Sequence, residues 1–353
     1  MKPGNSEPAS APNLVITGFM GTGKSRAGQE VARRLGRPFV DMDAEIEARA
    51  GKPIKRIFAE EGEAAFRRLE AELCRELAAP RGLVIATGGG ALVDPANRAA
   101  MRQGGTAVCL RCEPDEIVAR LAAEGGADRP LLAVADPRAE VARLLAARRP
   151  AYEAIPWQVD TTGLSVAEVA TRLAPFAGVV TLPVRPGMVP GDAYPIHVGP
   201  GLLDHLGGAL RAAGVPAGRR LAVVSNPVVE PLYGARTRAA LEAAGFVPLA
   251  CTVPDGEAHK TLATVAHLYD QFLAGGLDRS SLVLSLGGGV TGDLAGFAAA
   301  TFMRGLPFVQ VPTSLLAMVD ASVGGKTGAD LPQGKNLVGA FKQPRLVLVD
   351  PDL

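Results

Sequence analysis

Short apolar runs alternate with longer amphipathic segments along residues 12 to 176. The segments between the runs are rich in Ala, Glu, Arg and Leu, which favour helices. The runs expected to form strands are residues 14–17, 38–43, 83–87, 107–110 and 158–161. Strands that alternate with helices in this way predict a parallel sheet covered by helices.

The alternation breaks between residues 175 and 195, where prolines and glycines flank two short β-like runs, 179–184 and 194–198. It then resumes. The later expected strands are residues 221–225, 247–252, 282–286, 308–311 and 346–349. We therefore predict a tail at residues 1–11, a first α/β domain at 12–176 and a second at 177–353.

Composition and charge exclude several classes of protein. Lys and Arg number 37 against 36 Asp and Glu, so no basic field favours nucleic acid or a membrane surface. No apolar run reaches the length of a membrane span, and the first residues lack the apolar core of a signal peptide. The 4 cysteines are scattered and fit reduced thiols, so we expect a cytoplasmic protein.

The most informative motif is Gly18-Phe19-Met20-Gly21-Thr22-Gly23-Lys24-Ser25, directly after an apolar run. It has every fixed position of a phosphate-binding loop. The glycines let backbone N–H groups turn toward phosphate oxygens, Lys24 adds positive charge, and Ser25 can ligand Mg²⁺. A helix expected from about Ser25 to Leu35 would direct its positive end at the anion.

Asp41 and Asp43 follow the second expected strand, at the edge where open α/β sheets bind ligands. One could hold Mg²⁺ through water, and the other could accept a hydrogen bond from a substrate hydroxyl. The alternative is a structural strand end, with a helix N-cap just before residues 44–47.

Arginines and glycines could complete an acceptor site. Arg67 and Glu70 are three residues apart, so Glu70 can hold Arg67 as a fork for a carboxylate, although a solvated pair has the same spacing. The Gly88-Gly89-Gly90 run lets bare backbone approach a ligand. Arg129 lies in an expected lid, and Arg148 supplies a further cation of the kind phosphoryl transfer needs.

Together these motifs resemble shikimate kinase across residues 12–176. The resemblance implies that shikimate is held by Asp43, Arg67, Gly89 and Arg148, with Asp43 at the ring hydroxyls. It places Mg²⁺ at Ser25 and Asp41, and it gives catalytic roles to Lys24, Asp43 and Arg129. The implied ATP-binding residues are Gly21, Thr22, Gly23, Lys24, Ser25, Arg26 and Arg129. Arg120 is near the region that would hold adenine, but the adenine contacts stay open.

In the second domain, the expected strand 282–286 runs into Gly287-Gly288-Gly289-Val290-Thr291-Gly292-Asp293 and a helical run. A pyrophosphate could rest on this turn, although a tight strand-to-helix turn has the same composition. Lysines near glycine turns, as in the segments 320–327 and 334–336, suit a phosphorylated substrate.

The stretch 194–353 resembles the N-terminal, NAD-binding part of 3-dehydroquinate synthase. The resemblance implies substrate contacts from Asp320, Lys326, Lys335 and Asn336, with Lys326 also catalytic. The implied NAD contacts are Asp255, Gly256, Glu257, Lys260, Gly289, Val290, Thr291, Gly292, Asp293, Thr313, Ser314, Lys326 and Lys335. The fold class expected for the whole chain is therefore α/β, a P-loop domain like those of nucleoside monophosphate kinases followed by a Rossmann-like domain.

The zinc half of that synthase is expected to be absent here. The family's zinc site uses one glutamate and two histidines beyond the matched stretch, and none of His197, His205, His259 and His267 is paired at metal-ligand spacing. We expect no zinc ligand in this chain, with Zn²⁺ or Co²⁺ needed only by a completed synthase.

The sequence thus predicts an ATP:shikimate phosphotransferase in the shikimate pathway, joined to an incomplete phosphate-eliminating lyase. The expected ligands are ATP, Mg²⁺, shikimate and NAD, with DAHP, the seven-carbon phosphorylated substrate, for the second domain. The synthase part could also form a homodimer. The alternative is another small-molecule kinase, for gluconate or nucleoside monophosphates, with a non-catalytic NAD-binding or oligomerisation module.

Overall fold

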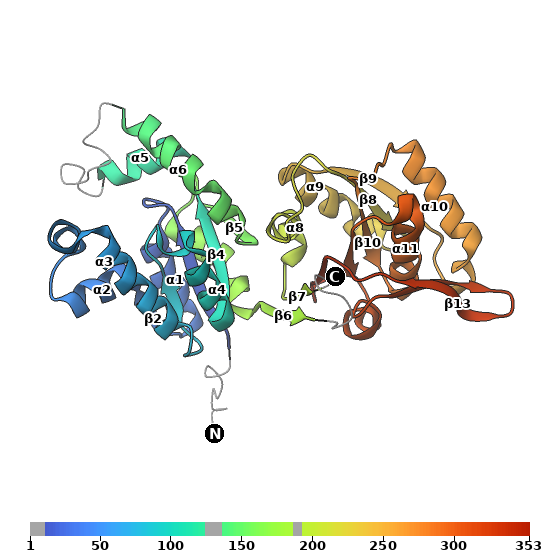
Figure 1. Ribbon diagram of the computed structural model, residues 1–353, viewed down its shortest axis with the longest axis horizontal. Helices are drawn as coiled ribbons and strands as arrows, with labels where there is room; N and C mark the ends of the chain where they lie inside the picture. Colours follow the sequence, from blue (N-terminus) through green and yellow to red (C-terminus); the bar gives the residue numbers. More distant parts are fainter. Residues whose placement is uncertain (1–10, 124–135, 186–192) are drawn as a thin grey trace, which may run out of the picture. The chain divides into compact units, whose positions relative to one another are not determined.

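The computed structural model describes residues 11–123, 136–185 and 193–353 (Figure 1). These residues fall into two compact units, unit 1 up to Val180 and unit 2 from Thr181 onward, each with its own sheet and apolar core. The α/β class predicted for both parts is confirmed.

Unit 1 is built on a five-stranded sheet in the order β2-β3-β1-β4-β5, and all of its paired strands run parallel. Its strands are β1 (Asn13–Gly18), β2 (Phe39–Asp41), β3 (Val84–Ala86), β4 (Gly105–Arg111) and β5 (Trp157–Asp160). Parallel pairing brings the carboxyl ends of β1, β2 and β3 to one edge of the sheet. Asp41 is the last residue of β2, the phosphate loop starts at the end of β1, and the three glycines come shortly after β3.

Helices cover both faces of this sheet. They are α1 (Lys24–Leu35), α2 (Met42–Ala50), α3 (Ile54–Leu77), α4 (Pro95–Gly104), α5 (Pro114–Ala123), α6 (Pro137–Glu153) and α7 (Val166–Leu173), with short 3₁₀ turns η1 (Ala91–Val93) and η3 (Ala174–Gly178). Successive residues of β1 face opposite sides. Val15 joins the core cluster that contains residues of α2 to α6, whereas Ile16 lies 3.5 Å from the position of a β-carbon on Gly28 in α1.

Local sequence explains where the helices near the site begin and end. Helix α1 starts after Gly23 and is followed by Gly36, and both glycines have positive φ angles, 90° and 64°. Helix α7 begins with a capping box between Ser165 and Glu168. The expected second strand, 38–43, was too long: β2 ends at Asp41, and α2 begins at Met42.

Unit 2 contains a seven-stranded sheet in the order β6-β7-β14-β11-β10-β8-β9. Its strands are β6 (Val180–Val184), β7 (Tyr194–Val198), β8 (Arg220–Ser225), β9 (Val247–Thr252), β10 (Leu282–Gly287), β11 (Phe308–Pro312) and β14 (Leu346–Val349). The pairs from β7 through β9 are parallel. Residues of α10, α11 and the central strands form its main apolar cluster.

The helices of unit 2 connect these strands. They are α8 (Leu206–Ala212), α9 (Ala235–Ala243), α10 (Leu262–Ala274) and α11 (Gly289–Thr301), with short turns η4 (Leu202–His205), η5 (Glu230–Gly234), η6 (Glu257–His259), η7 (Phe302–Arg304) and η8 (Ala317–Ala321). Within the described segments, no helix combines the length and the apolarity needed to cross a membrane.

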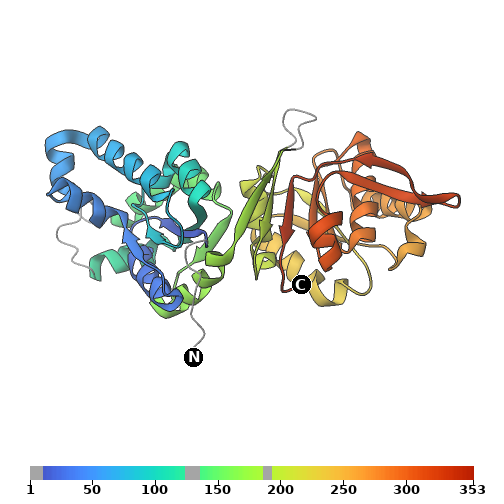
Figure 2. The same cartoon turned by 90° about the horizontal axis from the view of Figure 1, so that it is seen from below.

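A two-stranded antiparallel ribbon was not expected from the sequence. It consists of β12 (Lys326–Leu331) and β13 (Gly334–Phe341), drawn in red in Figure 2. One face of β13 packs through Val338 and Ala340 against the core of unit 2, while Leu337 and Phe341 are exposed. The ribbon carries Lys326, Lys335 and Asn336 on paired strands.

Candidate active site

The phosphate loop of unit 1 joins the end of β1 to the first turn of α1. Gly21 and Gly23 have φ angles of 77° and 90°, which only glycine adopts without strain. The Phe19 carbonyl accepts hydrogen bonds from the Thr22 hydroxyl at 2.7 Å and from Nζ of Lys24 at 3.0 Å. The loop is therefore closed on itself, with the ammonium group of Lys24 bonded back to the carbonyl of Phe19 near its start.

Burial and nearby carboxylates act in opposite directions on the pKa of Lys24. Burial of the ammonium group lowers the pKa of Lys24, and the nearby carboxylates of Asp43 and Asp41 oppose that shift. An ammonium group that is poorly solvated interacts more strongly with an anion than an exposed one does. Lys24 is thus suited to bind phosphate oxygens.

Ser25 and Asp41 form the pair expected to serve Mg²⁺. Oγ of Ser25 donates to Oδ2 of Asp41 at 2.5 Å, and both side chains offer the hard oxygen ligands that Mg²⁺ prefers. Among the described residues, no group of three or more His, Cys, Asp or Glu side chains could hold a metal ion by itself. A metal here would need further oxygens from the nucleotide or water.

Asp41, not Asp43, caps helix α2. Oδ1 of Asp41 accepts from the backbone N–H groups of Asp43 at 3.0 Å and of Ala44 at 3.3 Å. The helix-capping role considered as the alternative for Asp43 is therefore filled by Asp41. Asp43 lies in the first helical turn, and burial raises the pKa of its carboxyl, while Lys24 lowers it.

Three consecutive glycines after β3 bring the acceptor residues together. A β-carbon on Gly88 would lie 2.7 Å from Oδ1 of Asp43, and one on Gly90 would lie 2.6 Å from Nη1 of Arg67. At Gly89 it would approach Nη1 of Arg148 within 3.6 Å. Side chains at Gly88 and Gly90 would displace Asp43 and Arg67, and one at Gly89 would crowd the Gly18 carbonyl of the phosphate loop at 3.3 Å.

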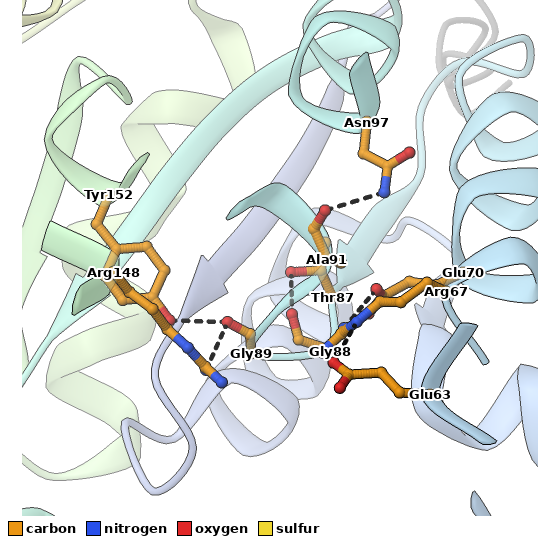
Figure 3. A network of polar contacts seen from close by, with 10 residues as sticks. All are labelled: Glu63, Arg67, Glu70, Thr87, Gly88, Gly89, Ala91, Asn97, Arg148 and Tyr152. Carbon is orange, nitrogen blue, oxygen red and sulfur yellow. Dashed lines mark hydrogen bonds and ion pairs between the residues drawn. The ribbon is translucent and has the colours of Figure 1, made fainter. Parts of the chain in front are cut away.

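Arg67 is held by two glutamates on its own helix. Its guanidinium donates to Oε2 of Glu70 at 2.8 Å and to Oε1 of Glu63 at 3.0 Å (Figure 3). Glu70 is 1% exposed, burial raises its pKa, and its second oxygen, Oε1, is buried without a hydrogen-bond partner. The buried Glu70 thus anchors Arg67, whose own side chain stays 39% exposed, so this is not the fully solvated pair that the spacing alone allowed.

Arg148 approaches the same glycines from helix α6. Its Nη1 donates to the Gly89 carbonyl at 3.2 Å, and its guanidinium lies 5.3 Å from the centre of the Phe19 ring. The Tyr152 hydroxyl donates to the same carbonyl at 2.7 Å (Figure 3). Tyr152 was assigned no role from the sequence. The one signal that could have indicated a role is its position four residues after Arg148.

The remaining expected residues of unit 1 are spread around this centre. Arg129 lies outside the described residues. Arg26 is exposed on α1. Arg120 donates to the carbonyl and hydroxyl oxygens of Thr161 at 2.7 and 3.2 Å, and a β-carbon on Gly23 would lie 3.9 Å from its Nη1. Arg120 therefore lies beside the phosphate loop, next to Gly23.

In unit 2, the glycine turn between β10 and α11 meets the segment after β11. The Gly287 carbonyl accepts from the Thr313 N–H at 3.1 Å. A β-carbon on Gly288 would lie 3.5 Å from Oγ of Ser314, and one on Gly289 would lie 3.3 Å from Cβ of Ala321. The turn at 287–293 and the pair Thr313 and Ser314 are thus neighbours, while Val290, Thr291 and Gly292 form the first turns of α11.

Lys260 lies at the centre of a second cluster. Its Nζ is 2.5 Å from Oδ2 of Asp293 and 2.5 Å from Oδ1 of Asn336, and the residue is only 4% exposed. Burial raises the pKa of Asp293, and the ion pair with Lys260 opposes that shift. One buried cation therefore joins α11 to the ribbon strand β13.

Three other expected residues of unit 2, Asp255, Glu257 and Lys335, form polar pairs. Lys335 pairs with Glu257 at 2.9 Å, and Oδ1 of Asp255 accepts from Nδ2 of Asn226 at 2.8 Å. A cavity of about 590 Å³ borders this cluster, and its lining includes Glu257, Lys335 and Asp330. Asn226 was not expected from the sequence, since it follows β8 without a motif of its own.

Three expected residues stand apart from those pairs. Gly256 precedes η6 with a φ angle of 99°. Asp320 lies in η8, and Lys326 is exposed at the start of β12. The two lysines lie toward opposite ends of the ribbon: Lys326 is paired with Phe341, whereas Lys335 follows Gly334, which pairs with Leu331 near the turn.

Residues 20–177 match the family model of shikimate kinase, and residues 250–353 match that of the N-terminal domain of 3-dehydroquinate synthase. The 3-dehydroquinate synthase of Pelotomaculum thermopropionicum is 56% identical over 160 residues, which cover 45% of this chain and 43% of that protein. That of Symbiobacterium thermophilum is 57% identical over 159 residues, covering 45% and 44%. The chain thus spans less than half the length of these curated relatives.

Solved structures match each half separately. A shikimate kinase from Acinetobacter baumannii in complex with shikimate is 35% identical, with a TM-score of 0.44, over 47% of this chain and 92% of that one. A 2-epi-5-epi-valiolone synthase from Streptomyces hygroscopicus with NAD⁺ and Zn²⁺ bound is 35% identical, with a TM-score of 0.42, over 48% and 46%.

Proposed function

We propose that this chain, in which residues 20–177 belong to the shikimate kinase family and residues 250–353 to the N-terminal family of 3-dehydroquinate synthase, phosphorylates shikimate with ATP. The observation that carries the proposal is the run of three glycines after β3. Gly88 adjoins Asp43, Gly89 adjoins the phosphate loop, and Gly90 adjoins Arg67. An acceptor site is thereby built directly beside a nucleotide phosphate site.

In the proposed reaction, the phosphate loop and Lys24 hold the phosphates of ATP. Arg67 and Arg148 bind the shikimate carboxylate, because a guanidinium offers two parallel N–H donors to a planar acceptor. Asp43 accepts the proton of the attacking hydroxyl as its oxygen forms a bond to the γ-phosphorus and the bond to the ADP oxygen breaks. Mg²⁺ bound at Ser25 and Asp41 would neutralise phosphate charge.

A panel of acceptors tests this function against the alternative of another small-molecule kinase. ATP consumption should require shikimate, because two arginines and one aspartate fit a carboxylate and ring hydroxyls together. We would measure ADP formation with shikimate, gluconate and a nucleoside monophosphate under the same conditions. A higher kcat/KM for gluconate or the monophosphate than for shikimate would contradict the proposal.

We further propose that unit 2 binds NAD at the 287–293 turn, with DAHP as the phosphorylated ligand of Lys326 and Lys335. The dinucleotide site is supported by the helix α11 N-terminus behind a glycine turn, and by Asp255 as an acceptor for ribose hydroxyls. A homodimer through unit 2 remains a prediction from the family resemblance, and sedimentation velocity would test it.

Asp255→Ala is expected to weaken NAD binding about tenfold or more, the usual cost of losing hydrogen bonds to a charged acceptor. Titration calorimetry of NAD into the wild type and the variant measures this effect. Asp270→Ala, on the exposed side of α10, is the matched control and should bind NAD as the wild type does. Equal affinities for all three chains would place the ribose elsewhere.

A further inference from the structure

We propose that Tyr152 is a positioning residue of the kinase site, a role that rests on the proposed phosphorylation of shikimate. Tyr152 follows Arg148 by one turn of α6, so both side chains leave the same face of the helix. Oη of Tyr152 and Nη1 of Arg148 both donate to the Gly89 carbonyl, at 2.7 and 3.2 Å (Figure 3). The two donors fill both lone pairs of one oxygen.

The Gly89 carbonyl differs from its neighbours in what holds it. The carbonyls of Gly88 and Gly90 accept backbone hydrogen bonds from Ala91 and Val93, each at 3.1 Å. The Gly89 carbonyl accepts from side chains of α6 instead. Because a glycine run has wide backbone freedom, an external restraint is needed to fix this peptide.

This peptide connects the two halves of the site. A β-carbon on Gly89 would lie 3.3 Å from the Gly18 carbonyl and 3.4 Å from the Met20 nitrogen of the phosphate loop. The peptide between residues 89 and 90 is planar, so the direction of its carbonyl sets the opposite direction of the Gly90 N–H. Holding the carbonyl therefore orients the glycine backbone between phosphate loop and acceptor.

Tyr152 also stabilises the position of Arg148. The guanidinium of Arg148 has two contacts that restrain it, the Gly89 carbonyl and the face of the Phe19 ring. If the Gly89 carbonyl turned away, Arg148 would lose its hydrogen bond to that carbonyl. The hydroxyl is a dependable donor, because a tyrosine is protonated at neutral pH and burial raises the pKa of Tyr152 further, to about 12.

The test removes one oxygen atom. Tyr152→Phe should raise KM for shikimate about three- to tenfold, the effect of one buried hydrogen bond, and change KM for ATP by less than twofold. Tyr269→Phe is the matched control, since it removes a tyrosine hydroxyl bonded to Thr301 at 2.6 Å in unit 2. The control should keep wild-type KM values. Midpoints of thermal unfolding for all chains show whether a change in KM merely follows lost stability.

A double-mutant cycle with Arg148→Lys separates positioning from packing. Lysine cannot make the two-pronged contact, so in that background the added Tyr152→Phe change should have a much smaller effect on KM for shikimate. Fully additive effects, or unchanged KM in Tyr152→Phe, would overturn the role of Tyr152 alone. A wild-type chain without shikimate-dependent ADP formation would overturn both this role and the proposed function.

Discussion

Lys24→Ala is expected to lower kcat for shikimate phosphorylation by about two orders of magnitude or more, the scale typical of a lost transition-state contact. The ammonium group is the one cation that the phosphate loop itself encloses, bonded to the Phe19 carbonyl. Burial disfavours solvation of this charge, and a poorly solvated charge interacts more strongly with the phosphates. Steady-state kinetics with saturating shikimate measure the loss.

The control for this variant is Lys55→Ala, which removes an exposed lysine from α3 in the same unit. It should keep wild-type turnover. A Lys24→Ala enzyme with kcat within a few-fold of the wild type would mean that phosphoryl transfer takes place away from this loop.

Asp43→Asn is expected to lower kcat/KM for shikimate by about 10²- to 10⁴-fold, the range for loss of a general base. Asparagine keeps the shape of the side chain but cannot take up the hydroxyl proton. Binding of ATP should survive, since Oδ1 of Asp43 lies next to Gly88, on the side of the site proposed to hold the acceptor. Calorimetry with ATP and kinetics with shikimate measure the two effects independently.

The pH profile gives a second signature of Asp43. Because burial raises its pKa, the carboxylate becomes protonated at a higher pH than an exposed aspartate does. Wild-type kcat/KM should therefore fall as pH decreases through that raised pKa, and this acidic limb should be missing from Asp43→Asn. Glu45→Gln, which alters a surface pair with Arg49 on the same helix, should retain the limb. Near-wild-type kcat/KM in Asp43→Asn would remove Asp43 from the acceptor site.

Much of the fold follows from periodicity, because buried parallel strands are short apolar runs separated by amphipathic helical segments. The five strands of unit 1 and the parallel strands of unit 2 fall where those runs lie. The predicted end of β2 was wrong. The Asp41 carboxylate accepts hydrogen bonds from the N–H groups of Asp43 and Ala44, and this cap starts a helix where alternation suggested a strand. The β12–β13 ribbon was missed because glycine and lysine motifs there resemble loops.

The site could be predicted only as far as motifs carry it. The phosphate loop, Arg67 and Arg148 stand in recognisable patterns, and the resemblance to both families is confirmed by the family matches. The burial of Glu70 and the shared carbonyl of Gly89 depend on how α3 and α6 pack against the sheet. No spacing along the chain reveals such contacts, so Tyr152 gained a role only from the structure.

The strand order of unit 1 has a consequence for the chain as it is synthesised. β1 lies between β3 and β4, and Gly18, where the phosphate loop begins, is paired with Leu110. The ribosome releases Lys24 early, but the strand that fixes the start of its loop emerges only with β4. Domains generally fold as units during synthesis. A nascent chain that ends before Gly105 therefore carries the complete nucleotide motif and β3, but lacks the strand that pairs with Gly18.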